Sequence, residues 1–211
     1  SEMCIRDRAK KAGYELYGLS FDYGQRHKFE LESARKIAQH LGFKEHIIFP
    51  LPLVQFGGSV LFQGEVPKKR SEEEIGKDIP PTYVPARNTI LLSIAVAYAE
   101  TIDAEVIFTG INSVDYSGYP DCRPIFIKNF QKLVDVATKK TVEGGKIKIE
   151  APLLYVSKSE IVKKGIELGL DFSITWSCYR NTKKPCGKCD SCRLREIGFR
   201  EAGIPDPLLQ K

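Results

Sequence analysis

Short apolar segments alternate with helical segments along most of this 211-residue chain. The apolar segments predict strands over Tyr14–Phe21, Glu45–Phe49, Glu105–Thr109 and Ile147–Ala151. Apolar spacing and end signals predict a helix closed by Gly42, a buried helix Arg87–Thr101, an amphipathic helix Ile125–Lys139, a helix from Ser157 to Gly169 and a short helix from about Cys192. This alternation is typical of a parallel sheet covered on both faces by helices, so we expect an α/β fold with a doubly wound parallel sheet.

Composition excludes a membrane protein and limits how the cysteines are used. Apolar residues make up 42% of the chain and charged residues 28%, as in ordinary globular proteins. No apolar run is long enough to cross a bilayer, and no charged-then-apolar leader is present, so we expect a cytoplasmic protein. Because disulfides are rare in the cytosol, the six cysteines need another explanation.

Four cysteines near the C-terminus have the spacing C-x7-C-x2-C-x2-C; they are Cys178, Cys186, Cys189 and Cys192. Two cysteines separated by two residues can place both sulfurs on one side of a turn, and Gly187 permits the tight backbone that this turn needs. Four thiolates fill a tetrahedral coordination sphere. We therefore predict one structural zinc ion per chain.

Other uses of clustered cysteines fit this pattern less well. The ferredoxin-like run C-x2-C-x2-C-x3-C-P is not completed. A zinc deaminase needs a His-x-Glu upstream, and none of the three histidines has a glutamate two residues later. The surrounding basic residues suit either neutralisation of a zinc–thiolate centre or contact with a nucleic acid; we favour neutralisation.

In an open α/β sheet, ligands bind beyond the carboxyl ends of the strands. The segments in that position are Ser20–Arg26, Gly110–Arg123 and Leu153–Ser157, with Pro85–Asn88 at the start of the buried helix as a further candidate. Arg87 could bind a carboxylate or phosphate with two hydrogen bonds, although a surface arginine is an equally good interpretation. The polar loop Asn112–Asp121 could recognise a purine or serve only as a turn. The chain has neither G-x-x-x-x-G-K-[ST] nor G-x-G-x-x-G, so neither common phosphate loop is present.

Together these segments resemble the 7-cyano-7-deazaguanine synthase family of the PP-loop, or adenine-nucleotide alpha-hydrolase, superfamily. The resemblance covers the chain from about Tyr14 to Pro207, and the matching stretches keep the family's order. They are SFDYGQRH (20–27), PPTYVPARNT (80–89), TGINSVDYSGYPDCRP (109–124), TWSCY (175–179) and CGKCDSC (186–192). The third stretch and the four-cysteine motif are specific to the family, whereas the first alone would not be.

The resemblance implies a C–N ligase of queuosine biosynthesis, a homodimer that converts 7-carboxy-7-deazaguanine and free ammonia to 7-cyano-7-deazaguanine. ATP, with magnesium, would activate the carboxylate, and a second ATP would drive dehydration of the amide to the nitrile. It also implies nucleotide-binding residues, namely Ser20, Arg87, Asn88 and Gly110. The implied substrate-binding residues are Tyr83, Asp115, Tyr119 and Asp121. It assigns zinc to the four cysteines and names no catalytic residue; we expect no membrane or nucleic-acid partner.

The chain departs from the family at its beginning. Family members open with a strand and an S-G-G-x-D-S loop around the pyrophosphate of ATP, and residues 1–8 (SEMCIRDR) stand in that place. We interpret residues 1–8 as a foreign or disordered leader and 9–172 as an α/β nucleotide-binding domain without its first strand and phosphate loop. Residues 173–211 would form the zinc-binding segment. We expect such a chain to fold but to turn over poorly.

Two other functions stay open from the sequence. One is a different PP-loop ATPase, such as a tRNA-thiolating enzyme, for which Cys122 would be the candidate thiol. The other is a non-catalytic zinc-knuckle protein that binds nucleic acid through Lys183, Lys184, Lys188 and Arg193.

Overall fold

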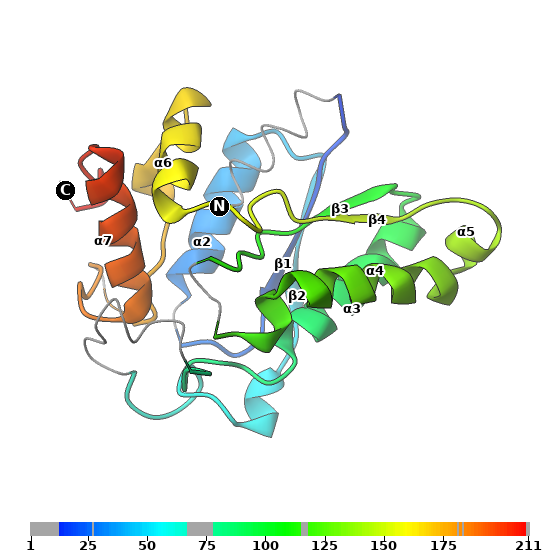
Figure 1. The fold of residues 1–211 in the computed structure, drawn as a ribbon, viewed down its shortest axis with the longest axis horizontal. Helices are drawn as coiled ribbons and strands as arrows, with labels where there is room; N and C mark the ends of the chain where they lie inside the picture. Colours follow the sequence, from blue (N-terminus) through cyan, green and yellow to red (C-terminus); the bar gives the residue numbers. More distant parts are fainter. Residues whose placement is uncertain are drawn as a thin grey trace.

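The computed structural model describes residues 13–26, 28–66, 78–114, 118–180, 182 and 184–209. The predictions for residues 1–8, Asp115 and Lys183 fall outside these ranges. Within them, strands and helices alternate as the sequence predicts (Figure 1).

The first half of the fold is a strand–helix–strand unit. Strand β1 (Tyr17–Asp22) leads into helix α2 (Phe29–His40), which buries Leu31 and Ala38, and strand β2 (Glu45–Pro50) follows. The chain reverses after α2 at Gly42, whose positive φ of 63° suits glycine. Strands β1 and β2 pair in parallel from Tyr17–Glu45 to Asp22–Pro50, which confirms the parallel arrangement.

The second half repeats this pattern. Helix α3 (Arg87–Thr101) precedes strand β3 (Val106–Phe108), helices α4 (Pro124–Ala137) and α5 (Lys139–Val142), and strand β4 (Lys148–Glu150). The bounds of α3 match the prediction. One predicted helix, Ile125–Lys139, is two: Thr138 has extended backbone and caps α5 by accepting a hydrogen bond from the N–H of Thr141 at 3.2 Å.

The C-terminal part packs two helices together at one end of the molecule (Figure 1). Helix α6 (Lys158–Glu167) begins with the predicted capping box of Ser157 and Glu160. Helix α7 (Asp190–Ala202) starts two residues earlier than predicted, because Cys189 is its extended N-cap residue. Gly198 lets the helices approach closely, since a Cβ there would lie 2.5 Å from the side chain of Lys158. Three 3-10 helices complete the described elements: Leu53–Phe56, Pro120–Cys122 and Phe172–Ile174.

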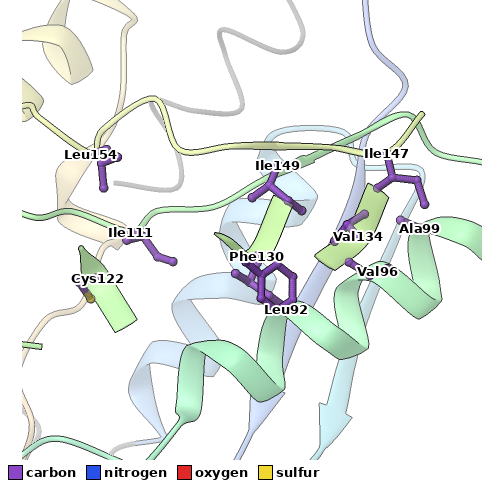
Figure 2. Packing of buried hydrophobic residues seen from close by; sticks show 10 residues of the cluster. All are labelled: Leu92, Val96, Ala99, Ile111, Cys122, Phe130, Val134, Ile147, Ile149 and Leu154. Carbon is purple, nitrogen blue, oxygen red and sulfur yellow. The ribbon is translucent and has the colours of Figure 1, made fainter. Parts of the chain in front are cut away.

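Apolar side chains from α3, α4 and β4 form the core behind β3. Figure 2 shows Leu92, Val96 and Ala99 of α3 facing the region where Phe130 and Val134 of α4 lie. Ile147 and Ile149 close the cluster from the β4 side. The helix predicted to be buried is buried on one face only, through Asn88, Leu92, Val96 and Ala99, while Thr89, Ser93, Ala97 and Thr101 form an exposed face.

The predicted single sheet differs from what the described residues form. They form two separate two-stranded parallel sheets, β1–β2 and β3–β4. A cavity of about 570 Å³ separates the two sheets and is lined by residues of both β1 and β3. In the part of the chain that the structure describes, no helix combines the length and apolarity needed to span a membrane.

Candidate active site and metal centre

A cluster of six side chains lies where β1 ends and α3 begins; we call it the strand-end cluster. Its members are Tyr23, Tyr83, Arg87, Asn88, Tyr119 and Asp121. Arg87 opens α3 and lies over the ring of Tyr23, with its guanidinium carbon 5.6 Å from the ring centroid. Its Nη1 donates to the Tyr23 hydroxyl at 3.4 Å. The ring and the hydroxyl hold Arg87 at the helix N-terminus, where anions are favoured.

Arg87 keeps its positive charge in this environment. Burial opposes it, but the surrounding tyrosine hydroxyls and the carboxylate of Asp121 raise the pKa of Arg87 above its ordinary value. Burial also raises the pKa of Tyr23 to about 12, so this phenol stays neutral. The preceding residue, Ala86, has a left-handed φ of 52°, a conformation that costs a non-glycine residue about 1–3 kcal/mol and that clusters at functional sites.

Asp121 connects the loop after β3 to the start of α3. Its Oδ2 accepts from the backbone N–H of Asn88 at 3.0 Å, and its backbone carbonyl accepts from Asn88 Nδ2 at 3.1 Å. Both side chains are buried. Asp121 therefore caps α3 from a position 33 residues after Asn88 in the sequence.

Two tyrosines form the outer part of the strand-end cluster. The rings of Tyr83 and Tyr119 lie 6.1 Å apart. The Tyr83 hydroxyl accepts from the N–H of Ala86 at 3.1 Å, and the Tyr119 hydroxyl lies 2.7 Å from Oγ1 of Thr82. Gly118, next to Tyr119, lets the backbone oxygen of Asp78 approach closely, because a Cβ at this position would clash with that oxygen. The structure thus places Tyr83, Tyr119 and Asp121 beside Arg87 and Asn88.

The other predicted residues are distributed differently. Ser20, Asn88 and Gly110 line the cavity between β1 and β3, and the Ser20 hydroxyl lies 2.9 Å from Nε2 of His46. Asp115 lies outside the described residues. Tyr23 was not among the predicted site residues, although it stands inside the SFDYGQRH stretch. Neither was the fully buried Gln25, whose Oε1 accepts from the N–H of Tyr23 at 2.8 Å and so fixes the loop after β1.

The four predicted metal ligands come together as one cluster. The sulfurs of Cys178, Cys186, Cys189 and Cys192, the cysteine cluster, all lie within 4.8 Å of one another. The sulfurs of Cys186 and Cys192 are 3.9 Å apart, close to the separation of about 3.8 Å across a tetrahedral Zn²⁺ with 2.3 Å bonds. The donor set fits a soft, four-coordinate metal ion with no open position.

The hydrogen bonds of the cysteine cluster also suit a bound metal ion. The Cys178 sulfur accepts from the backbone N–H groups of Arg180 and Cys186, each at 3.4 Å. Hydrogen bonds from Cys189 and Cys192 lower the pKa of Cys178, while hydrogen bonds to its neighbours raise the pKa of Cys192. Four thiolates this close repel one another unless a cation lies between them, so the cluster is suited to a metal ion.

A buried ion pair supports the helix that carries Cys192. Arg195 donates to both carboxylate oxygens of Asp206, from Nε at 2.6 Å and from Nη2 at 2.8 Å. Its Nη1 also donates to Oγ1 of Thr175 at 2.7 Å. Tyr179, next to Cys178, packs against the apolar cluster that contains Tyr23 and Val84. The cysteine cluster and the strand-end cluster therefore belong to one scaffold.

Cys122 has the properties of a packing residue. It is buried, and its sulfur accepts from Asn88 Nδ2 at 3.4 Å. Burial, and then the carboxylate of Asp121, raise the pKa of the Cys122 thiol to about 11. A thiol that is almost fully protonated at neutral pH is a weak nucleophile, which disfavours the thiolating enzyme as an alternative.

These features define an α/β protein with a polar strand-end cluster and a four-cysteine centre that could hold a metal ion. The model of the family described as "Queuosine biosynthesis protein QueC" matches residues 1–203, and the chain belongs to that family. The chain is similar to the 7-cyano-7-deazaguanine synthase of Syntrophus aciditrophicus, with 54% identity over 94% of this chain and 88% of that protein. It is also similar to the synthase of Desulfatibacillum aliphaticivorans, with 53% identity over 94% of this chain and 87% of that protein. The synthase of Pseudomonas aeruginosa is 50% identical over 94% of this chain and 88% of that protein. The resemblance noted from the sequence is confirmed.

Proposed function

We propose that this chain is a C–N ligase that converts 7-carboxy-7-deazaguanine and ammonia to 7-cyano-7-deazaguanine with ATP, in queuosine biosynthesis. The observation that carries the proposal is its 50–54% identity, over 94% of the chain, to proteins named 7-cyano-7-deazaguanine synthase. The reaction needs ATP because a carboxylate is a poor electrophile and oxide is a poor leaving group. Transfer of an adenylyl group to the carboxylate releases pyrophosphate, and attack by ammonia then releases AMP and leaves the amide.

We assign the anion-binding role in this reaction to Arg87. Its guanidinium stays protonated at the N-terminus of α3, because its pKa is raised, and the helix dipole there also favours an anion. A carboxylate or a phosphate bound at this point would approach the carboxyl ends of the strands. Asn88 supports this position through Asp121, and Ser20 and Gly110 are proposed to face the nucleotide.

The deazapurine base would be recognised beside Arg87. The paired rings of Tyr83 and Tyr119 offer a surface on which a base can stack. Asp121 and Asp115 supply carboxylates that can accept from an exocyclic amine and a ring N–H, as guanine-like bases require. We propose zinc for the cysteine cluster, magnesium with ATP, a homodimer and a cytoplasmic location on the strength of the family resemblance.

Calorimetric titration with 7-carboxy-7-deazaguanine, alongside AMP release in the presence of ATP and ammonia, tests the proposed function. Arg87→Met should weaken binding of the carboxylate, and lower any AMP release, by about 10²–10³-fold. Arg123→Met is the matched control, because Arg123 is exposed and directly follows the buried residues Asp121 and Cys122. No detectable deazaguanine binding, or equal effects of the two substitutions, would refute the role of Arg87.

A further inference from the structure

Gln25, in the loop after β1, carries a fully buried amide, and only 1% of its surface is exposed. Glutamine is mostly found at protein surfaces, because burying an amide costs free energy unless its donors and acceptor are hydrogen-bonded. A buried glutamine with all of these bonds made holds its neighbours in one arrangement. In this chain the segment that it holds is the one that carries Tyr23.

The Gln25 amide makes three hydrogen bonds to two different elements. Its Oε1 accepts from the N–H of Tyr23 at 2.8 Å, and its Nε2 donates to the backbone carbonyl of Phe21 at 3.2 Å. The same nitrogen donates to Oε1 of Glu30, in the first turn of α2, at 2.9 Å. Only an amide can accept and donate in this way, since a carboxylate only accepts and a hydrocarbon does neither. Gln25 thus connects the end of β1 to the start of α2.

Tyr23 passes this constraint on to Arg87. Its hydroxyl accepts from Nη1 of Arg87 at 3.4 Å, and its ring lies under the guanidinium, 5.6 Å from the guanidinium carbon to the ring centroid. The ring also packs against Phe62, with centroids 6.2 Å apart. Packing therefore holds the ring of Tyr23, while the bond from its N–H to Gln25 holds its backbone. The position of the Arg87 guanidinium depends on both.

Gly24 allows the side chain of Gln25 to reach back to Tyr23. Its φ of 86° is in the left-handed region that favours glycine, and a Cβ there would lie 2.7 Å from the side chain of Val54. The N–H of Gly24 donates to Oδ1 of Asp22 at 3.4 Å, which closes the turn further. The four residues from Asp22 to Gln25 therefore form a compact turn whose hydrogen bonds are centred on Tyr23.

We propose that Gln25 is a positioning residue for substrate binding: its amide, held by Glu30, fixes Tyr23, and Tyr23 sets the position of Arg87 toward the substrate carboxylate. This inference rests on the proposed function, in which Arg87 binds that carboxylate. Gln25 acts through Tyr23 and not on the substrate, because it is buried and its hydrogen bonds are made within the protein. Position matters because an arginine binds a carboxylate with two parallel hydrogen bonds only in a narrow range of geometries.

Calorimetric titration of Gln25→Met with two ligands tests the proposal on the full chain. Methionine keeps the volume of the side chain but removes all three hydrogen bonds, so binding of 7-carboxy-7-deazaguanine should weaken at least about tenfold. Binding of 7-deazaguanine, which has no carboxylate for Arg87, should stay unchanged. A merely structural role would weaken both ligands alike. Gln39→Met, at an exposed position of α2, is the matched control and should change neither. Equal loss for the two ligands, or no loss for either, would overturn the proposal.

An exchange of the two side-chain types gives a second test, which does not depend on Gln25→Met being folded. Gln25→Glu keeps an acceptor for the N–H of Tyr23 but places a carboxylate against Glu30, so it should also weaken binding of 7-carboxy-7-deazaguanine. Adding Glu30→Gln returns an amide donor to this contact and should improve binding at least about threefold over Gln25→Glu alone. Circular dichroism checks that each variant is folded. A double variant that binds no better than Gln25→Glu would contradict the role of the amide.

A double-mutant cycle with Arg87→Met separates this inference from the proposed function. When the guanidinium is absent, Gln25→Met should cause no further loss of carboxylate binding, because the group that it positions is gone. A further loss of about tenfold would show that Gln25 acts independently of Arg87 and would overturn the inference. If Arg87→Met weakens binding and Gln25→Met does not, the inference fails and the proposed function stands. If Arg87→Met has no effect, the proposed role of Arg87 fails and the inference fails with it.

Discussion

The cysteine cluster and the strand-end cluster are built in opposite ways. All four cysteines come from one stretch of 15 residues, Cys178–Cys192, and their sulfurs converge through local turns. The strand-end cluster draws on segments that begin at Tyr23, Thr82 and Tyr119, which are far apart in sequence. Its geometry depends on how β1, α3 and the loop after β3 pack against one another.

This difference decides what each region requires. The cysteine cluster could hold a metal ion, and we expect its stability to depend on that ion, because four close thiols have few other sources of stability. The strand-end cluster satisfies its own polar groups: Asp121 caps α3, and the tyrosine hydroxyls bond to neighbouring residues. We expect the first region to respond strongly to metal removal and the second to respond to changes in packing.

The largest effect, on metal content and on the stability of the C-terminal segment, is expected from Cys178→Ser. Cys178 is fully buried, and its sulfur also accepts two backbone hydrogen bonds, so serine there removes both a ligand and an acceptor. Structural zinc contributes about 10–16 kcal/mol of binding free energy in small domains. We expect loss of the bound metal and early unfolding of residues 173–209, measured by metal content and amide hydrogen exchange.

Cys122→Ser is the matched control, because Cys122 is also buried but lies against Asn88. It should keep one metal ion per chain. Equal metal content in Cys178→Ser and the parent protein would contradict the assignment of the cysteine cluster as a metal centre.

A smaller effect, on the free energy of unfolding, is expected from Asp206→Ala. This substitution leaves the charge of Arg195 buried beside Thr175 and Phe172, and removing one partner of a buried ion pair costs about 3–5 kcal/mol. Glu196→Ala is the control on the same helix: Glu196 pairs with Arg193 at the surface, where such a pair contributes at most about 1 kcal/mol. Urea denaturation of both variants measures the difference. Similar losses would show that Asp206 does not anchor α7.

The cysteine cluster was more predictable from the sequence than the strand-end cluster. The spacing of the cysteines is enough to identify the ligand set, and Ser157 with Glu160 is enough to place the start of α6, because both patterns act within a few residues. The bounds of α3 were also predictable, since its apolar run is long and only Ser93 interrupts it.

The long-range contacts were not predictable from one sequence. Nothing near Asp121 indicates that it caps a helix starting 34 residues earlier, and nothing in Tyr23 indicates that it will lie under Arg87. The separation into two sheets is also a tertiary property: the strand runs predict strands but not which edges meet.

Two substitutions of Asp121 can distinguish its capping of α3 from its proposed recognition of the base. Asp121→Ala removes the acceptor for the N–H of Asn88 and should lower the free energy of unfolding by about 1–2 kcal/mol. Asp121→Asn keeps an acceptor oxygen and should cost less stability. If Asp121 also recognises the base, both variants should bind 7-carboxy-7-deazaguanine at least about tenfold more weakly, which calorimetry measures. Normal binding by Asp121→Asn would limit Asp121 to its capping role.

The smallest effect is expected from Ser157→Ala, which removes a cap that is entirely local. Loss of an N-cap serine costs about 1 kcal/mol, because the cap stabilises only the first turn of α6. The hydrogen bonds from Ser157 lower the pKa of Glu160 from its ordinary value of 4.5. A lowered pKa in the folded state stabilises the fold above the unfolded pKa, and this stabilisation is lost as the pH falls through the folded value. The stability difference between the parent protein and Ser157→Ala should therefore be full at pH 7 and shrink in acid, when urea denaturation is repeated at pH values on both sides of 4.5. A difference that stays constant down to the lowest pH would show that the serine acts on the helix without the carboxylate, and the reciprocal capping box would then contribute only one of its two hydrogen bonds.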